Sequence, residues 1–203
     1  MSDLKQQLKP ENPPSFEPPS KKSEAIESFK SFIWETVKII IISLIIIIPI
    51  RYYVIQPFYV KGASMEPNFY DHEYLIIDEI SYRFSEPERG DIVVFRYPKN
   101  PDDYFIKRII GLPGERIVIS EGVVKIFNAD HPGGYVLDES SYLPAGTKTS
   151  GEIDITLNES EYYVLGDNRA SSLDSRRFGP INRSDIVGKT WIRGWPFDRI
   201  KVF

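Results

Sequence analysis

The chain of 203 residues contains no cysteine and only two histidines, and its 25 Lys and Arg residues against 29 Asp and Glu residues give a net charge of −4. The lack of cysteine excludes disulfide scaffolds, thiol nucleophiles and iron–sulfur clusters, and two histidines cannot build a three-histidine metal site. The acidic balance, with no long basic run, argues against a nucleic-acid partner.

The first part of the sequence changes character at about residue 23. Residues 1–22 hold five prolines between Pro10 and Pro19 among polar side chains, and such a segment buries too little apolar surface to offset the entropy of ordering. Further on, ten of the twelve residues in 39–50 are aliphatic. We therefore expect a disordered tail at 1–22 and a membrane-anchoring helix at 23–55.

Two other interpretations of the apolar segment are weaker. A buried core helix would keep a polar face, whereas here isoleucines occupy every side. A cleavable signal peptide would begin nearer the N-terminus and end in small residues. Six lysines precede the apolar run, while only Arg51 and Lys61 follow it closely. The positive-inside rule then places the tail in the cytoplasm and residues 56–203 outside.

Beyond the anchor, short segments rich in Val, Ile, Tyr and Phe alternate with turns of Gly, Pro, Asp and Asn. No ten-residue helical pattern separates them, so the sequence predicts a mostly β domain built on an antiparallel sheet at 56–203. The predicted strands are Tyr52–Lys61, Tyr74–Ile80, Asp91–Tyr97, Tyr104–Ile110, Arg116–Ser120, Val123–Phe127, Glu152–Leu157, Glu161–Leu165 and Ile186–Trp191. The Pro-, Gly- and Ser-rich stretch 128–151 is expected to be an inserted loop or a small β subdomain.

Lys107 lies in one of these predicted strands among apolar residues. The simpler explanation is an edge lysine that discourages aggregation. If the lysine is buried instead, desolvation lowers its pKa toward neutrality, and a neutral amine can serve as general base for a serine hydroxyl. Neither His72 nor His131 has the sequence context of a Ser-His-Asp triad. The residues alone leave both roles for Lys107 open.

Ser64 is the best candidate to pair with such a lysine. It follows the first predicted strand, in a turn where Gly62 permits close backbone approach and Pro67 restricts Glu66 to extended geometry. A serine in a turn is most often structural. This short motif is therefore a weak indication on its own.

Four blocks of sequence stand in order behind the apolar segment. They are Ser64–Pro67, Arg89–Phe95, Phe105–Glu115 and Gly166–Arg176. Together they resemble the bacterial type I signal peptidases, or leader peptidases, over roughly residues 30–203 except for much of 128–151. The resemblance implies a serine endopeptidase with a Ser-Lys dyad, which removes N-terminal signal peptides from exported preproteins after small residues at −1 and −3.

The resemblance also implies roles for single residues at the matched positions. Ser64 would be the nucleophile, Lys107 the general base, and the Ser172 hydroxyl would orient the lysine amine. Two supporting ion pairs are implied, Asp167 with Arg108 and Asp174 with Arg176. Without the resemblance, the charged run 167–177 would be typical of a solvated loop.

Two positions depart from the family pattern. The Ser64 backbone N–H would be one donor to the oxyanion, and the second is usually a serine hydroxyl where Gly62 stands here, which leaves that donor open. Asn68 stands where the family usually has threonine. The peptide substrate is expected to lie extended beside a strand. The apolar pocket walls expected for it are Phe58, Val60, Met65 and Ile106.

The expected partners are preprotein signal peptides and the lipid bilayer, with no metal, no cofactor and no nucleic acid. The expected location is the cell membrane, or a thylakoid membrane if the organism has one, crossed by a single helix with the catalytic domain outside. Two alternatives stay open. A repressor-type Ser-Lys autoprotease shares the catalytic pair but would be expected to carry a DNA-binding module, and a non-catalytic membrane-anchored β domain also fits the composition.

Overall fold

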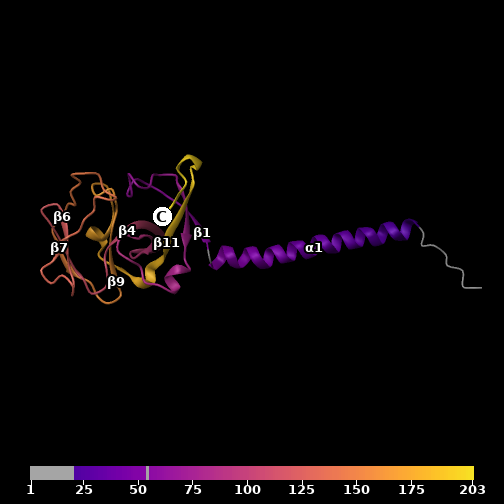
Figure 1. Cartoon of the computed structure of the whole chain (residues 1–203), viewed down its shortest axis with the longest axis horizontal. Helices are drawn as coiled ribbons and strands as arrows, with labels where there is room; N and C mark the ends of the chain where they lie inside the picture. Colours follow the sequence, from indigo (N-terminus) through magenta and orange to yellow (C-terminus); the bar gives the residue numbers. More distant parts are fainter. Residues whose placement is uncertain (1–20, 54) are drawn as a thin grey trace, which may run out of the picture. The chain divides into compact units, whose positions relative to one another are not determined.

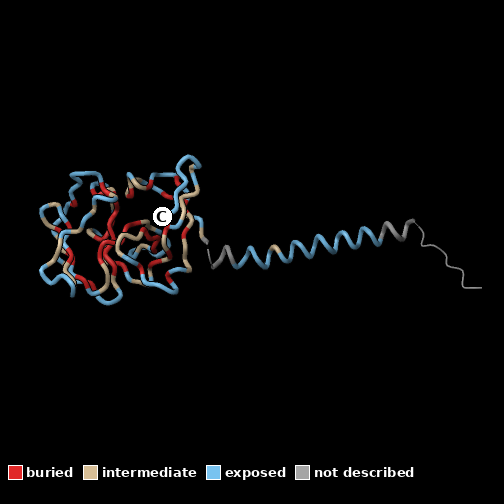
Figure 2. Tube along the Cα trace, viewed as in Figure 1, coloured by how far each residue is buried: buried red, intermediate tan, exposed pale blue. Residues whose placement is uncertain are grey.

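The computed structural model describes residues 21–53 and 55–203 (Figure 1). The chain divides after Ile47 into two compact units. Most of helix α1, Lys21–Tyr53, belongs to the first unit, and all the strands belong to the second. The segment Glu27–Pro49 of α1 is long and apolar enough to cross a membrane, and none of its apolar window is buried (Figure 2). The prediction of one apolar N-terminal helix is therefore confirmed.

The helix bounds differ slightly from the predicted 23–55. Residues 21 and 22 are helical, and the rest of the predicted tail lies outside the described residues. Tyr52 and Tyr53 are also helical, although the first predicted strand included them, and that strand, β1, spans only Ile55–Tyr59.

The larger sheet is antiparallel, with the strand order β1-β2-β11-β3-β4-β9-β10 and with β12 beside β11. After β1, its strands are β2 (Tyr74–Asp78), β3 (Ile92–Tyr97), β4 (Asn100–Gly111), β9 (Glu161–Leu165), β10 (Ile181–Asn182), β11 (Ile186–Trp195) and β12 (Lys201–Val202). A short helix α2 (Ser175–Phe178) and three 3-10 turns, Ser81–Arg83, Arg183–Asp185 and Phe197–Arg199, lie in the connections. The predicted mostly β, antiparallel fold is confirmed.

A second antiparallel sheet has the order β7-β6-β5-β8. Its strands are β5 (Arg116–Ser120), β6 (Val123–Phe127), β7 (Tyr135–Val136) and β8 (Ile153–Thr156). The expected insertion at 128–151 supplies only the two-residue β7 to it. The second sheet is thus larger than that prediction, because β5, β6 and β8 pair with each other and not with the main sheet.

Strand β4 connects the three hydrophobic clusters of this unit. Ile109 packs in the first cluster with residues of β3, β9 and β11, and Ile110 packs in the second with residues of β5, β6 and β9. Ile106 packs against the third, which contains residues of β2, β3 and the turn after β1. The last five residues of β4 are all buried. Side chains in this part of β4 therefore lie inside the protein on both faces of the strand.

Candidate active site

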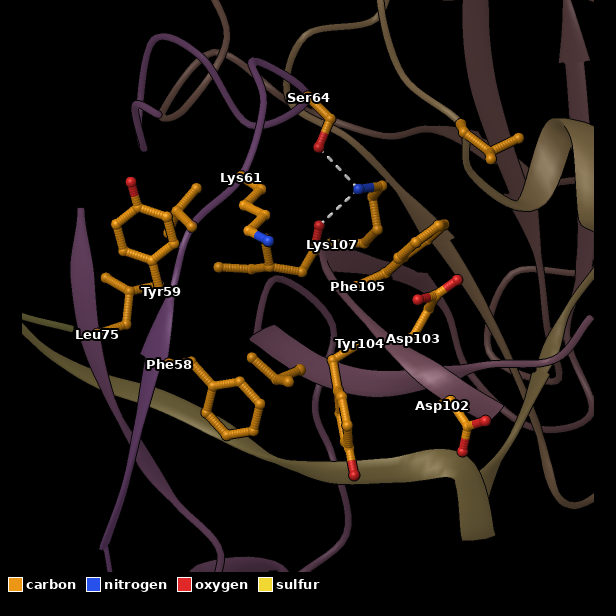
Figure 3. Close-up of a pocket in the computed structure, with 14 residues that line it drawn as sticks. Phe58, Tyr59, Lys61, Ser64, Leu75, Asp102, Asp103, Tyr104, Phe105 and Lys107 are labelled. Carbon is orange, nitrogen blue, oxygen red and sulfur yellow. Dashed lines mark hydrogen bonds between the residues drawn. The ribbon is translucent and has the colours of Figure 1, made fainter. Parts of the chain in front are cut away.

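Lys107 occupies the buried part of β4, opposite Val93 of β3. The residue is only 3% exposed. Its Nζ atom donates hydrogen bonds to Ser64 Oγ at 2.8 Å and to the Ile106 carbonyl oxygen at 2.7 Å (Figure 3). The Phe105 ring centre lies 5.4 Å from Nζ. The alternative of an exposed edge lysine is wrong, because the side chain lies inside the protein beside the predicted serine.

Burial also changes the acidity of this amine. Loss of water around the ammonium lowers the pKa of Lys107 to about 8, and the carboxylates of Asp174 and Asp167 raise it by less. At pH 8 a large fraction of the amine is then neutral. A neutral amine 2.8 Å from a hydroxyl can accept its proton.

The turn that carries Ser64 is anchored in the third hydrophobic cluster. Met65 and Phe69, which follow the serine, are 1% and 0% exposed. The backbone N–H groups of Asn68 and Phe69 both donate to the Met65 carbonyl oxygen, at 3.0 and 2.9 Å. The buried apolar side chains therefore hold the turn against the hydrophobic cluster. Ser64 itself lines the cleft.

The loop after β9 holds the same turn from the other side. Asn168 donates its backbone N–H to the Ser64 carbonyl oxygen and its side-chain amide to the Ala63 carbonyl oxygen, both at 3.0 Å. The Asn68 side chain donates to Asp167 Oδ2 at 2.8 Å and to the Tyr142 carbonyl oxygen at 2.7 Å. Sequence reasoning did not assign Asn168 a role, although it lies within the block Gly166–Arg176. Its amide contacts depend on a turn a hundred residues away.

Gly62 was expected to be a part of the oxyanion site, but its backbone amide binds another residue. Its backbone N–H donates to Asp71 Oδ1 at 2.8 Å, so this amide is not free to bind an oxyanion. The left-handed conformation of Gly62, with φ of +85°, suits glycine and turns the chain toward Ser64. Within the described residues the Ser64 N–H has no acceptor and stays available.

Both ion pairs implied by the resemblance are present. Arg108 makes two hydrogen bonds to Asp167, at 2.8 and 2.7 Å, and its guanidinium stacks 4.1 Å from the Tyr142 ring centre. Arg176 likewise makes two bonds to Asp174, at 2.9 and 2.8 Å. Although burial alone would raise the pKa of Asp174, the hydrogen bonds and charge of Arg176 lower it overall. Bidentate arginine–carboxylate pairs of this kind stabilise the charged form of a carboxylate inside the protein.

Ser172 lies beside the turn that carries Ser64 but makes no hydrogen bond to Lys107. A Cβ atom placed on Gly166 would lie 2.2 Å from Ser172 Oγ and 2.4 Å from the Ser64 carbonyl oxygen, so only glycine fits between them. The Ser172 hydroxyl is buried and lies toward the Asp174 carboxylate, where its interaction helps to lower the pKa of that acid. The expected hydrogen bond from Ser172 to the Lys107 amine is not formed in this structure, because that amine bonds to Ser64 and to the Ile106 carbonyl oxygen instead.

A cleft of about 530 Å³ opens beside Ser64 and Lys107. Three of the four expected apolar wall residues, Phe58, Val60 and Ile106, line it. Met65 does not, because its side chain points into the core. Lys61, Asp102 and Asp103 also line the cleft, and sequence reasoning assigned them no role (Figure 3). In residues 21–53 and 55–203, no three His, Asp or Glu side chains gather closely enough to hold a metal ion.

The model of the protein family described as "Signal peptidase, peptidase S26" matches residues 33–195 of this chain. The chain belongs to this signal peptidase family. A relative named "Probable signal peptidase I-2" from Synechocystis sp. is 38% identical over 168 residues, which cover 80% of this chain and 73% of the relative. Signal peptidase I of Leptolyngbya laminosa is 33% identical over 190 residues, 90% of either chain. A crystal structure of signal peptidase I from Enterococcus faecalis is 29% identical and covers 52% of this chain and 97% of its own, with a TM-score of 0.42.

Proposed function

We propose that this signal peptidase family member cleaves signal peptides from preproteins with Ser64 as nucleophile and Lys107 as general base. One observation carries the proposal: the buried Lys107 amine, with a pKa lowered to about 8, lies 2.8 Å from the Ser64 hydroxyl at the edge of a cleft. A serine hydroxyl needs an adjacent base to become a nucleophile. This contact supplies one without a histidine.

The proposed reaction runs in two halves. Neutral Nζ of Lys107 takes the Ser64 proton while Oγ bonds to the scissile carbonyl carbon, and the resulting ammonium returns that proton to the leaving amine as the C–N bond breaks. The signal peptide is then an ester on Ser64. Water, losing a proton to Nζ, attacks the ester, and the Ser64 hydroxyl is restored as the signal peptide leaves.

The negative charge that forms on the carbonyl oxygen needs hydrogen-bond donors. The free Ser64 N–H can be one of them. Since the Gly62 amide is bound to Asp71, the second donor in this proposal is a group other than the Gly62 backbone. The Asn168 contacts to residues 63 and 64 support the same arrangement, because they fix the peptide unit that carries the Ser64 N–H.

The cleft suits an extended peptide with small side chains near the cleaved bond. Phe58, Val60 and Ile106 form apolar walls next to Ser64, and an apolar wall accepts alanine-sized groups without leaving polar atoms unpaired. We therefore propose that small residues at −1 and −3 of the preprotein enter here. The Arg108–Asp167 and Asp174–Arg176 pairs, together with Ser172, then act as the structural support behind the dyad.

The membrane part of the proposal rests on α1. Its Glu27–Pro49 segment matches the roughly 20 residues that span a bilayer, and the lysines before it favour a cytoplasmic N-terminus. We propose a single-pass anchor that keeps the strand-bearing unit on the outer side of the cell membrane, or of a thylakoid membrane where one exists.

The decisive experiment is cleavage of a preprotein in detergent by the full chain, by Ser64→Ala and by Lys107→Ala. Both variants are expected to lose at least about a thousandfold in kcat/KM, since members of a catalytic pair act as a unit. For the wild type, kcat/KM should rise with pH until about 8, where Lys107 becomes neutral. Wild-type cleavage by either variant would disprove the dyad.

A further inference from the structure

One cation in the cleft takes no part in the proposed proton transfer. Lys61 lies three residues before Ser64, lines the same cleft, and extends its side chain into it (Figure 3). Lys107 is buried and serves as a base, whereas Lys61 is exposed. An exposed lysine is a compact cation at neutral pH.

In the part of the chain that the structure describes, no group neutralises the charge of Lys61. No carboxylate or hydrogen-bond acceptor among the described residues contacts its ammonium. Asp71, close by in sequence, accepts hydrogen bonds from the N–H groups of Gly62 and His72 and pairs with the His72 ring at 3.0 Å. Asp103, on the cleft wall, accepts from the Asn100 side chain at 2.9 Å. The ammonium is therefore available to whatever binds in the cleft.

We propose that Lys61 is a specificity-determining residue that selects bound peptides by charge, favouring a carboxylate at position −2 and disfavouring a cation there. This inference rests on the proposed function, which places the cleaved bond at Ser64. Successive side chains of an extended peptide point to opposite sides. If the side chains at −1 and −3 enter the apolar walls, the side chain at −2 points away from them toward solvent, within reach of an exposed, flexible group that lines the cleft, such as Lys61.

The test uses three peptides that differ only at −2, which is Asp, Asn or Lys, with alanine at −1 and −3. They are cleaved by the wild-type chain in detergent, by Lys61→Glu and by Lys61→Met. Lys125→Glu is the matched control, because Lys125 is an exposed lysine on β6 of the second sheet, outside the cleft. The quantity compared is the ratio of kcat/KM for the Asp and Lys peptides, which does not depend on how much of each variant is folded.

For the wild type this ratio is expected to be about threefold to tenfold at low salt, the range of a solvent-exposed charge pair and its like-charge counterpart. It should approach one in Lys61→Met, fall below one in Lys61→Glu and keep its wild-type value in Lys125→Glu. Raising the salt to about 0.5 M should reduce the wild-type ratio by screening.

Two failures are distinguishable. If the wild type cleaves none of the three peptides, and Ser64→Ala behaves identically, the proposed function fails. If the wild type cleaves the Asn peptide, the proposed function stands. If, in addition, the ratio of kcat/KM for the Asp and Lys peptides is the same in Lys61→Glu as in Lys125→Glu, the role of Lys61 is overturned.

Discussion

The two sheets of the strand-bearing unit bury their residues in different ways. In the second sheet, β6 alternates strictly, with Val124 and Ile126 inside and Lys125 in solvent. In the main sheet, the end of β4 is buried on both faces and includes two cations, Lys107 and Arg108. The first pattern is that of a strand with one solvent-exposed face and one buried face. The second brings charges into the interior, where each needs a partner or loses its charge.

The two neighbouring cations of β4 illustrate both outcomes. Arg108 keeps its charge because Asp167 binds it with two hydrogen bonds. Lys107 has no carboxylate within 4.0 Å among the described residues, only a hydroxyl and a carbonyl oxygen, and burial lowers its pKa to about 8. The protein thus accepts a local loss of stability at the position where the proposed chemistry needs a neutral amine.

The largest expected effect is at this lysine. Lys107→Met should abolish cleavage and yet stabilise the fold below pH 8, because a pKa of about 8 against the ordinary 10.5 means that charging the buried amine costs about 3 kcal/mol. Between pH 8 and 10.5 the unfolded chain binds more protons than the folded one, so wild-type stability rises with pH. The gain should therefore shrink over that range. Urea unfolding at pH 6.5 and pH 10.5 measures it, and an equal difference at both values would contradict the argument.

The second prediction compares one deletion in each sheet. Ile126 of β6 and Ile109 of β4 are both fully buried, and replacing either by alanine should cost about 2–5 kcal/mol of unfolding free energy. Ile109→Ala should also lower kcat, since it removes packing two residues from Lys107. Ile126→Ala should keep a wild-type kcat at temperatures where it stays folded. Thermal melts with kinetics at 15 °C test this, and equal kcat losses in the two variants would remove the functional contrast between the sheets.

The smallest effect is expected on the outer surface of the second sheet. Arg116 pairs there with Asp154 at 2.6 Å, but both side chains are about half exposed. A solvent-exposed pair contributes little to stability, so Arg116→Ala should shift the urea midpoint only slightly and leave kcat/KM unchanged. A loss comparable to that of Ile126→Ala would show that this surface pair matters more than its exposure indicates.

Much of the architecture was predictable because it depends on local pattern. The apolar segment of α1 and the alternation in β5 and β6 follow from residue periodicity, and these strands were predicted with their observed bounds. The two-residue strands β7, β10 and β12 were missed, since two residues carry no period. The extent of the second sheet was also missed, because pairing of β5 with β8 joins segments some thirty-five residues apart.

The site divides in the same way. Ser64, Lys107 and the four charged residues behind them could be named from ordered motifs that resemble a known family. The sequence could not indicate that the Gly62 amide donates to Asp71, that the Met65 side chain points into the core, or that Ser172 makes no hydrogen bond to Lys107. Each of these depends on the direction of a side chain or amide in a turn, which long-range packing sets.

By itself, the sequence determined the apolar helix, the β character of the rest and the identity of the candidate Ser-Lys pair, because periodicity, composition and ordered motifs are properties of the chain read in one dimension. Only the tertiary structure decided whether Lys107 is an exposed edge lysine or a buried amine beside Ser64. The outcome depends on which segments pack around β4. They pack closely enough to exclude water from the amine and to bring the hydroxyl of Ser64, 43 residues away in sequence, within 2.8 Å of it.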